Sequence, residues 1–199
     1  MGDAAKRDAT YDDLRRVADH LLAQIVDGEL IVQPRPAIEH QHVTSVLGGE
    51  LSYPFGRGRG GPGGWWILDE PELHLRRDIV VPDLAGWRRA RVPVLSTGPF
   101  LSIAPDWVCE VLSPSTAGLD RVRKLAVYAR EQVEHAWLID PIAHTLEVLR
   151  RDGTHWLIVG SHAGGEVVRA EPFDAIELEL AALWLTPAPE PILAEAPLE

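Results

Sequence analysis

An acidic residue interrupts an apolar stretch that is typical of a buried strand. The run Trp107–Leu112 consists of aromatic, β-branched and other apolar residues apart from Glu110, and the turn-forming Ser113–Ser115 ends it. An ionised carboxylate inside an apolar strand is tolerated only when a cation, a metal ion or a set of hydrogen-bond donors holds it. We therefore expect a partner group to lie opposite Glu110.

A second apolar run also contains a single acid. Asp83 directly follows Pro82 within Val80–Ala85 and precedes Glu110 by 27 positions. If the two runs form neighbouring strands, their carboxylates converge on one point. Carboxylate oxygens drawn from separate strands suit Mg²⁺ or Mn²⁺, which take only a few protein ligands and keep several waters.

Periodicity predicts one α/β (α+β) domain over residues 10–185. Helical spacing predicts helices at Tyr11–Leu22, Ile38–Leu51 and Thr116–Arg130, and a short terminal helix that ends at Leu185. Apolar runs bounded by turn residues predict strands at Ala23–Val26, Glu29–Val32, Trp65–Leu68, Leu73–Leu75, Ile79–Trp87, Trp107–Leu112, Ala136–Asp140, Leu146–Leu149 and Trp156–Val159. The first two strands flank Asp27-Gly28, which favours a tight hairpin. Residues 1–9 are expected to be a loose start, and residues 186–199 a proline-rich, acidic, unpacked tail.

Composition limits the setting and the partners. A hydrophobic share of 46% and seven tryptophans suffice for a core, and no apolar run reaches the ~18 residues that a membrane span needs. The start of the chain lacks a signal segment and Cys109 is the only cysteine, which together indicate a reducing, cytoplasmic setting. A formal net charge of −11 opposes attraction to phosphate backbones unless the basic residues cluster.

Lys124 receives two opposite interpretations. On a helical wheel it lies near Asp120 and Glu131, away from the apolar arc of the helix, which favours a solvated ion-pair face. However, the chain contains 17 arginines and only two lysines, so a position that remains lysine is a candidate for chemistry that a guanidinium cannot perform.

Several segments together resemble a known family. They resemble the PD-(D/E)XK restriction-endonuclease-like superfamily and, more narrowly, the bacterial Uma-type endonucleases, over about Tyr11 to Leu185. The segments that carry the resemblance are Val26–Leu30, Pro34 and Pro36 with His40, Val81–Leu84, Cys109–Thr116, Asp120, Lys124–Ala129 and Ala136–Pro141.

The resemblance implies a restriction-endonuclease-like mixed β-sheet core flanked by helices, with an N-terminal helix and hairpin. It implies that Asp83, Glu110 and the backbone carbonyl of Val111 hold Mg²⁺ or Mn²⁺. The usual lysine position of the superfamily is a leucine in this chain, so the resemblance assigns the catalytic lysine to Lys124 on the next helix. The resemblance also implies that Glu29 is an additional acid near the metal ion, and that His40 and Tyr128 are residues that line the site.

The expected activity is Mg²⁺-dependent hydrolysis of phosphodiester bonds in DNA. Phosphate positioning is expected from arginines near the two acids and the lysine: Arg88, Arg89, Arg91, Arg121 and Arg123. One alternative is a catalytically silent fold that acts in protein interaction or regulation, with a homodimer as a further expectation. A second alternative is a hydrolase whose paired carboxylates act as general acid and base, as in glycoside cleavage.

Overall fold

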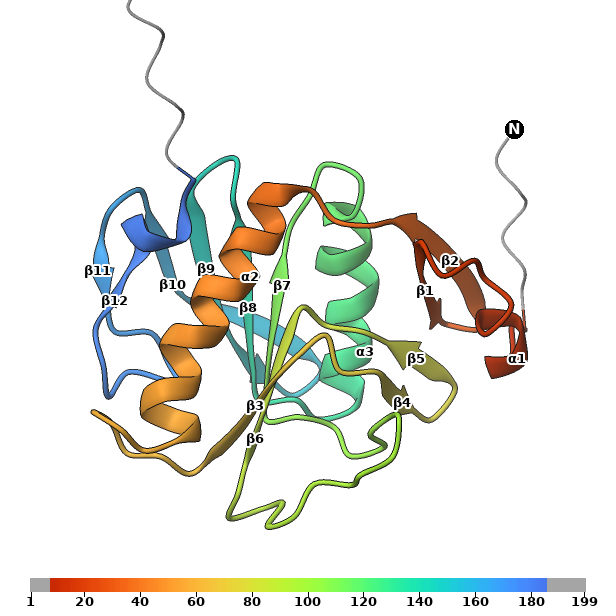
Figure 1. Cartoon of the computed structure of the whole chain (residues 1–199), viewed down its shortest axis with the longest axis horizontal. Coiled ribbons are helices and arrows are strands. Elements are labelled where there is room, and N and C mark those ends of the chain that lie inside the picture. The colour runs from red at the N-terminus through yellow and green to blue at the C-terminus, as the bar shows by residue number, and fades with distance from the viewer. Residues whose placement is uncertain (1–7, 186–199) are drawn as a thin grey trace, which may run out of the picture.

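The strands form two main sheets and a small two-stranded ribbon. A computed structural model describes residues 8–185, so the expectations for residues 1–7 and 186–199 lie outside the described part. The six-stranded sheet has the order β10-β9-β8-β7-β6-β3, and the four-stranded sheet has the order β2-β1-β5-β4 (Figure 1). Their bounds are β1 Leu21–Val26, β2 Glu29–Pro34, β3 Trp65–Asp69, β4 Leu73–Leu75, β5 Asp78–Val80, β6 Leu84–Arg88, β7 Trp107–Val111, β8 His135–Asp140, β9 Thr145–Asp152 and β10 His155–Ala163, with β11 Val167–Val168 and β12 Leu178–Glu179 in the ribbon.

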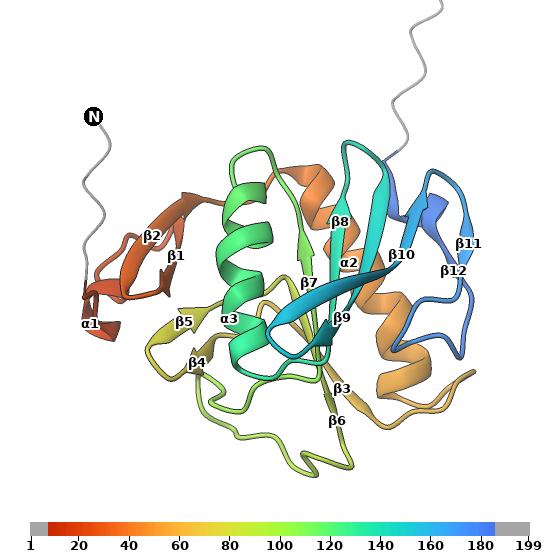
Figure 2. The same cartoon turned by 180° about the vertical axis from the view of Figure 1, so that it is seen from behind.

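Helices cover both faces of the six-stranded sheet. The helix α2 (Ile38–Leu51) crosses one face, and the continuous segment of η2 (Leu119–Lys124) and α3 (Leu125–Arg130) covers the other, as the two opposite views in Figures 1 and 2 show. The remaining helical segments are short: α1 Tyr11–Leu14, η1 Ser52–Gly56 and η3 Leu180–Leu183. No helix between residues 8 and 185 combines the length and apolar character that crossing a membrane requires.

The centre of the sheet is a parallel pair, β7 and β8, whereas the other pairings are antiparallel. Two parallel neighbours need a long crossover, and η2 with α3 supplies it. Every residue of β7 is buried because both faces of the strand are covered. This arrangement confirms the predicted mixed-sheet α/β (α+β) class.

Two predicted elements are wrong. The helix expected at Tyr11–Leu22 ends at Leu14, because Leu21 and Leu22 already pair with β2, and a four-residue helix with no buried residue has little to extend it. The single strand expected at Ile79–Trp87 is two strands in different sheets. Pro82 lies in the break and cannot donate a ladder hydrogen bond, which leaves Asp83 between the two sheets.

The hairpin and α2 follow their predictions closely. Asp27 and Gly28 have φ values of 53° and 78°, the left-handed conformations that a type I′ turn needs. Ala9 N–H donates to the Gly28 carbonyl at 2.8 Å, so the end of the segment expected to be loose is joined to this turn. The helix α2 has the expected bounds.

Candidate active site

Glu110 lies in the buried strand β7 on the face that α3 covers. Side chains alternate along a strand, so Cys109 and Val111 contribute to the core beside α2 while Glu110 points to the opposite face. Its Oε2 accepts a hydrogen bond from Lys124 Nζ at 2.5 Å, and its Oε1 accepts one from the Tyr128 hydroxyl at 2.5 Å. The buried carboxylate therefore has the cationic partner that its position requires.

Lys124 reaches Glu110 from a helix with an irregular turn. Asp120, Lys124 and Tyr128 are spaced four residues apart and are all buried, whereas Val122 is 68% exposed. The helical wheel grouped Lys124 with Asp120 correctly, but the solvated face assigned to them is wrong, because this polar side of η2 faces Glu110 of β7 and is buried. The scarcity of lysine was the more useful sequence signal.

Asp83 occupies the break between β5 and β6, beside the end of β7. Its Oδ2 accepts a hydrogen bond from Val111 N–H at 2.6 Å, and its Oδ1 lies 3.2 Å from His40 Nε2. Burial alone would lower the pKa of His40, but the hydrogen bond and charge of Asp83 outweigh burial and raise it. His40 thus acts as a hydrogen-bond donor that holds the Asp83 carboxylate.

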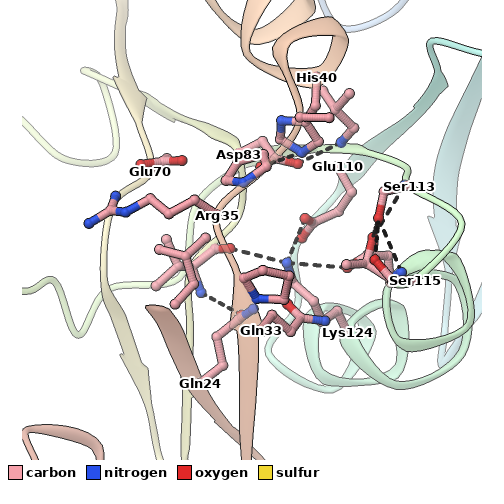
Figure 3. A pocket seen from close by; sticks show the side chains of 18 of the residues that line it. Gln24, Gln33, Arg35, His40, Glu70, Asp83, Glu110, Ser113, Ser115 and Lys124 are labelled. Atoms are coloured by element: carbon pink, nitrogen blue, oxygen red, sulfur yellow. Dashed lines mark hydrogen bonds and ion pairs between the residues drawn. The ribbon is translucent and has the colours of Figure 1, made fainter. Parts of the chain in front are cut away.

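His40, Asp83, Glu110 and Lys124 line one pocket of about 330 Å³, whereas Tyr128, which was expected to line it, is fully buried behind Glu110 and does not. In Figure 3 the Glu110 carboxylate points toward the Lys124 amine near the centre of the view, Asp83 lies beside His40, and Gln24 and Gln33 enter from the β1–β2 hairpin. Other polar residues that line it are Gln24, Gln33, Arg35, Glu70, Ser113, Ser115, Thr116 and Asp120.

The sequence analysis missed Arg35 as a residue of this pocket. The available signal was its position between Pro34 and Pro36, which fix φ and end the second hairpin strand. Arg35 is exposed, and one of its guanidinium nitrogens donates to the Asp19 carbonyl at 2.9 Å. It has no carboxylate partner within residues 8–185, so the other guanidinium donors face solvent and the pocket rim.

The pocket contains more acid than base. Burial raises the pKa of Glu110 to about 8; the charge of Lys124 opposes this rise, and two nearby aspartates add to it. Burial also raises the pKa of Asp120, whose Oδ1 lies 3.5 Å from Lys124 Nζ. Burial alone would lower the pKa of Lys124, but Glu110 and the aspartates raise it overall, so the amine remains an ammonium. Three acids therefore share one lysine.

The donor set fits a hard divalent cation. Within residues 8–185 no group of three or more His, Cys, Asp or Glu side chains is arranged to hold a metal ion. Mg²⁺ does not need such a group, because it is commonly bound through one or two carboxylates and keeps its other waters. Asp83 and Glu110 supply two, and each oxygen that already accepts one hydrogen bond retains a second lone pair.

Glu29 is not brought to this pocket. It is the first residue of β2, beside the hairpin turn, whereas the residues that line the pocket come from the other end of that strand. A strand rises about 3.3 Å per residue, so the two ends are well separated. The Glu29 carboxylate instead lies 2.8 Å from Arg123 Nη1, and Arg123 Nη2 donates to the Val26 carbonyl at 2.7 Å.

The other arginines expected to position phosphate also lie outside the pocket lining. Asp83 precedes the first residue of β6, whereas Arg88 is its last residue and Arg89 and Arg91 come directly after it. The strand therefore carries all three arginines away from the pocket. Arg88 pairs with Glu134 at 2.6 Å. Arg121 pairs with a carboxylate too. Arg89 donates to the carbonyls of Trp65 and Gly56. Arg91 donates to the Asp106 carboxylate and to the Ala104 carbonyl.

Comparisons with known proteins agree with the predicted family. The Uma2 family, described as "Putative restriction endonuclease", matches residues 9–182. Among solved structures, the fold is similar to "a putative nuclease belonging to DUF820" from Anabaena variabilis, with a TM-score of 0.70 and 20% identity over 88% of this chain and 97% of that chain. At that identity the similarity concerns the fold alone. No curated protein matches the chain.

Proposed function

The chain belongs to the Uma2 family, and from that premise we propose that it is a Mg²⁺-dependent endonuclease that hydrolyses phosphodiester bonds in DNA. The observation that carries the proposal is the convergence of Asp83, Glu110 and Lys124 on one pocket. One acid from β7, a second acid from the break between β5 and β6, and a buried amine line the same pocket, which is an arrangement suited to phosphoryl chemistry.

Asp83, Glu110 and the Val111 carbonyl are the groups that would hold the metal ion. When bound, Mg²⁺ polarises a phosphoryl oxygen and lowers the pKa of a coordinated water. The His40 contact and the Val111 N–H fix the Asp83 carboxylate from two sides, so its orientation is set before any ligand arrives. Preorganised ligands avoid the cost of ordering them during the reaction.

Lys124 acts as a fixed positive charge. The surrounding acids raise its pKa, which favours the ammonium form at neutral pH and a charge-stabilising role over proton abstraction. It donates to Glu110 and, at 3.1 Å, to the Val81 carbonyl, so its position is determined by β7 and by the break between β5 and β6, the two segments that carry the acids. We assign it the stabilisation of negative charge that develops on the phosphoryl group.

Arg35 takes the role first expected of the arginines outside the pocket. Its exposed guanidinium at the rim lacks a carboxylate partner among the described residues, and it is therefore available for a phosphate oxygen. A single arginine at the rim gives weak, salt-sensitive binding, in keeping with the acidic chain.

The test is cleavage of a fluorescent duplex oligonucleotide with Mg²⁺ or with EDTA. Asp83→Asn and Lys124→Met should each lower the rate by about 100-fold or more. Arg59→Gln is the control, because Arg59 is exposed and lies outside the pocket lining. Equal cutting by wild type and by both site variants, or cutting that persists in EDTA, would contradict the proposal.

One observation favours a silent interaction module instead. Both oxygens of Glu110 already accept hydrogen bonds, from Lys124 and Tyr128, so this part of the pocket is satisfied without a ligand. A silent module predicts no cleavage under any metal condition and no divalent-ion binding. Binding of Mn²⁺ that requires Asp83 distinguishes the two functions even if the DNA substrate is wrongly chosen.

A further inference from the structure

The two edges of the six-stranded sheet differ in their protection. At one edge, β3 packs beside α2 and η1, and only its last residue, Asp69, is exposed. At the other edge, β10 has nine residues and pairs with β9 alone among the described strands. The backbone N–H and C=O groups on the outer side of β10 are therefore available to another strand, except for the Ala163 N–H at its end, which donates to Glu166 Oε1 at 3.1 Å.

The exposed side chains of β10 are apolar. Leu157, Ile158 and Val159 are 46%, 61% and 40% exposed, and they are consecutive in the middle of the strand. A strand with one solvated face alternates apolar and polar residues, so three consecutive exposed apolar residues leave apolar surface on both faces of this edge. Surface of this kind at an unpaired edge favours association.

The strand also lacks the charges that usually prevent edge pairing. Proteins protect edges with lysine, other charged residues, proline or bulges. His155–Ala163 contains no Lys, Arg, Asp, Glu or Pro, in a chain where 25% of residues are charged. Two features protect the strand locally: a register shift between Ile158 and Gly160, and the Glu166 carboxylate, which accepts a hydrogen bond from Ala163 N–H at the end of the strand.

We propose that β10 pairs in antiparallel fashion with β10 of a second copy, which forms a homodimer with one continuous sheet. A strand without charges is its own suitable partner, because a two-fold axis near Ile158 places the apolar middle of one strand against that of the other. A partner that carried charges along this edge would have to bury them against apolar side chains. Two copies with net charge −11 associate best along surfaces with few carboxylates, and the middle of β10 contributes none, because Glu166 lies at the Ala163 end of the strand.

The pairing is independent of the proposed nuclease activity. No residue of β10 lines the pocket that contains Asp83 and Glu110. A monomeric protein that cuts DNA would overturn the dimer and leave the activity intact, and an inactive dimer would do the reverse.

The test is sedimentation velocity over a hundredfold range of protein concentration. Wild type should show a species of twice the 21.9 kDa chain mass. Ile158→Lys places two like charges near the axis and should weaken the dimer by about 100-fold or more. Ile142→Lys is the matched control, because Ile142 is 69% exposed on the turn after β8, and this variant should remain dimeric.

Hydrogen exchange on the unmodified protein gives a second readout. The outer amides of β10 should exchange more slowly as the concentration rises through the dimer transition, while the amides of α1 should not change. A wild-type protein that stays monomeric overturns the proposal. So does a dimer that Ile158→Lys and Ile142→Lys affect equally, or a dimer in which β10 amides keep their monomer exchange rates.

Discussion

Two aspartates accept backbone hydrogen bonds at opposite ends of the β6–β7 pair, but their surroundings differ. Asp106 accepts from Arg88 N–H at 2.7 Å and from Arg91 Nε at 2.8 Å. Asp83 accepts from Val111 N–H at 2.6 Å, and the neighbour of its second oxygen is a histidine. Both aspartates thus join the same two strands, but within residues 8–185 only Asp106 of the two forms an ion pair with an arginine.

The difference separates an acid that supports the fold from an acid that is available for chemistry. Around Asp106, each nearby acid has an arginine, since Glu134 pairs with Arg88. Around Asp83, the acids outnumber the single ammonium of Lys124 and line a pocket. An excess of buried acid costs stability, so its presence at one end alone favours a ligand-binding role there.

The largest expected effect in this comparison is on stability. Asp106→Asn removes the charge that holds Arg91 and should lower the free energy of unfolding by about 2 kcal/mol. The loss is no larger because Arg91 is partly exposed, so solvent screens the ion pair. Asp83→Asn should leave it unchanged or raise it, because it relieves repulsion and the amide oxygen still accepts from Val111 N–H. Urea denaturation with EDTA present measures both values.

Equal losses of stability in the two variants would contradict this distinction. The rate of DNA cleavage is the matching control. Asp106→Asn should retain the wild-type rate under conditions in which it is folded, and Asp83→Asn should not.

A smaller effect is expected on DNA binding. Arg35→Gln should weaken binding of an oligonucleotide by about tenfold and lower the salt dependence by about one ion, because one phosphate contact is lost. Arg91→Gln makes the same charge change at the Asp106 end and should have no such effect. Fluorescence anisotropy in the Lys124→Met background, which we expect not to cut, measures binding without cleavage. Equal effects of the two arginine variants would contradict the assignment to Arg35.

The smallest expected effect concerns two histidines, one at each end. Asp83 raises the pKa of His40 against the opposing effect of burial, whereas burial lowers the pKa of His135. His40 should therefore stabilise the fold below pH 6.5 and lose that contribution as the pH rises through its folded pKa. His135 has the opposite sign: its contribution is present above pH 6.5 and is lost as the pH falls through its folded pKa.

NMR titration of the imidazole signals in EDTA checks this prediction. Asp83→Asn should lower the pKa of His40 and leave that of His135 unchanged. The same direction of shift for both histidines in the wild-type protein would show that Asp83 does not carry the charge assigned to it.

Local patterns in the sequence predicted the elements that depend on local chemistry. The buried strand around Glu110, the helix Ile38–Leu51 and the Asp27-Gly28 hairpin all follow from periodicity and turn residues. The combination of short motifs also predicted the family correctly.

Features that depend on distant contacts were not predictable in this way. The burial of Lys124 depends on the packing of its helix against Glu110 of β7, and the helix expected to extend to Leu22 lost its last residues to pairing with β2. Arg35 joins the pocket because the hairpin folds beside it, and Arg88 leaves it because a strand carries the chain away from Asp83. Distance along the chain suggested the reverse, because Arg88 is close to Asp83 in the sequence and Arg35 is far from it.

The most direct test of the account is calorimetric titration of Mn²⁺ into the wild-type protein, Asp83→Asn and Asp106→Asn. The account predicts one ion per wild-type chain, an affinity at least about 10- to 100-fold weaker for Asp83→Asn, and an unchanged affinity for Asp106→Asn. No binding to wild type, or equal binding to all three proteins, would contradict the assignment of a metal-dependent active site to the Asp83 end of the sheet.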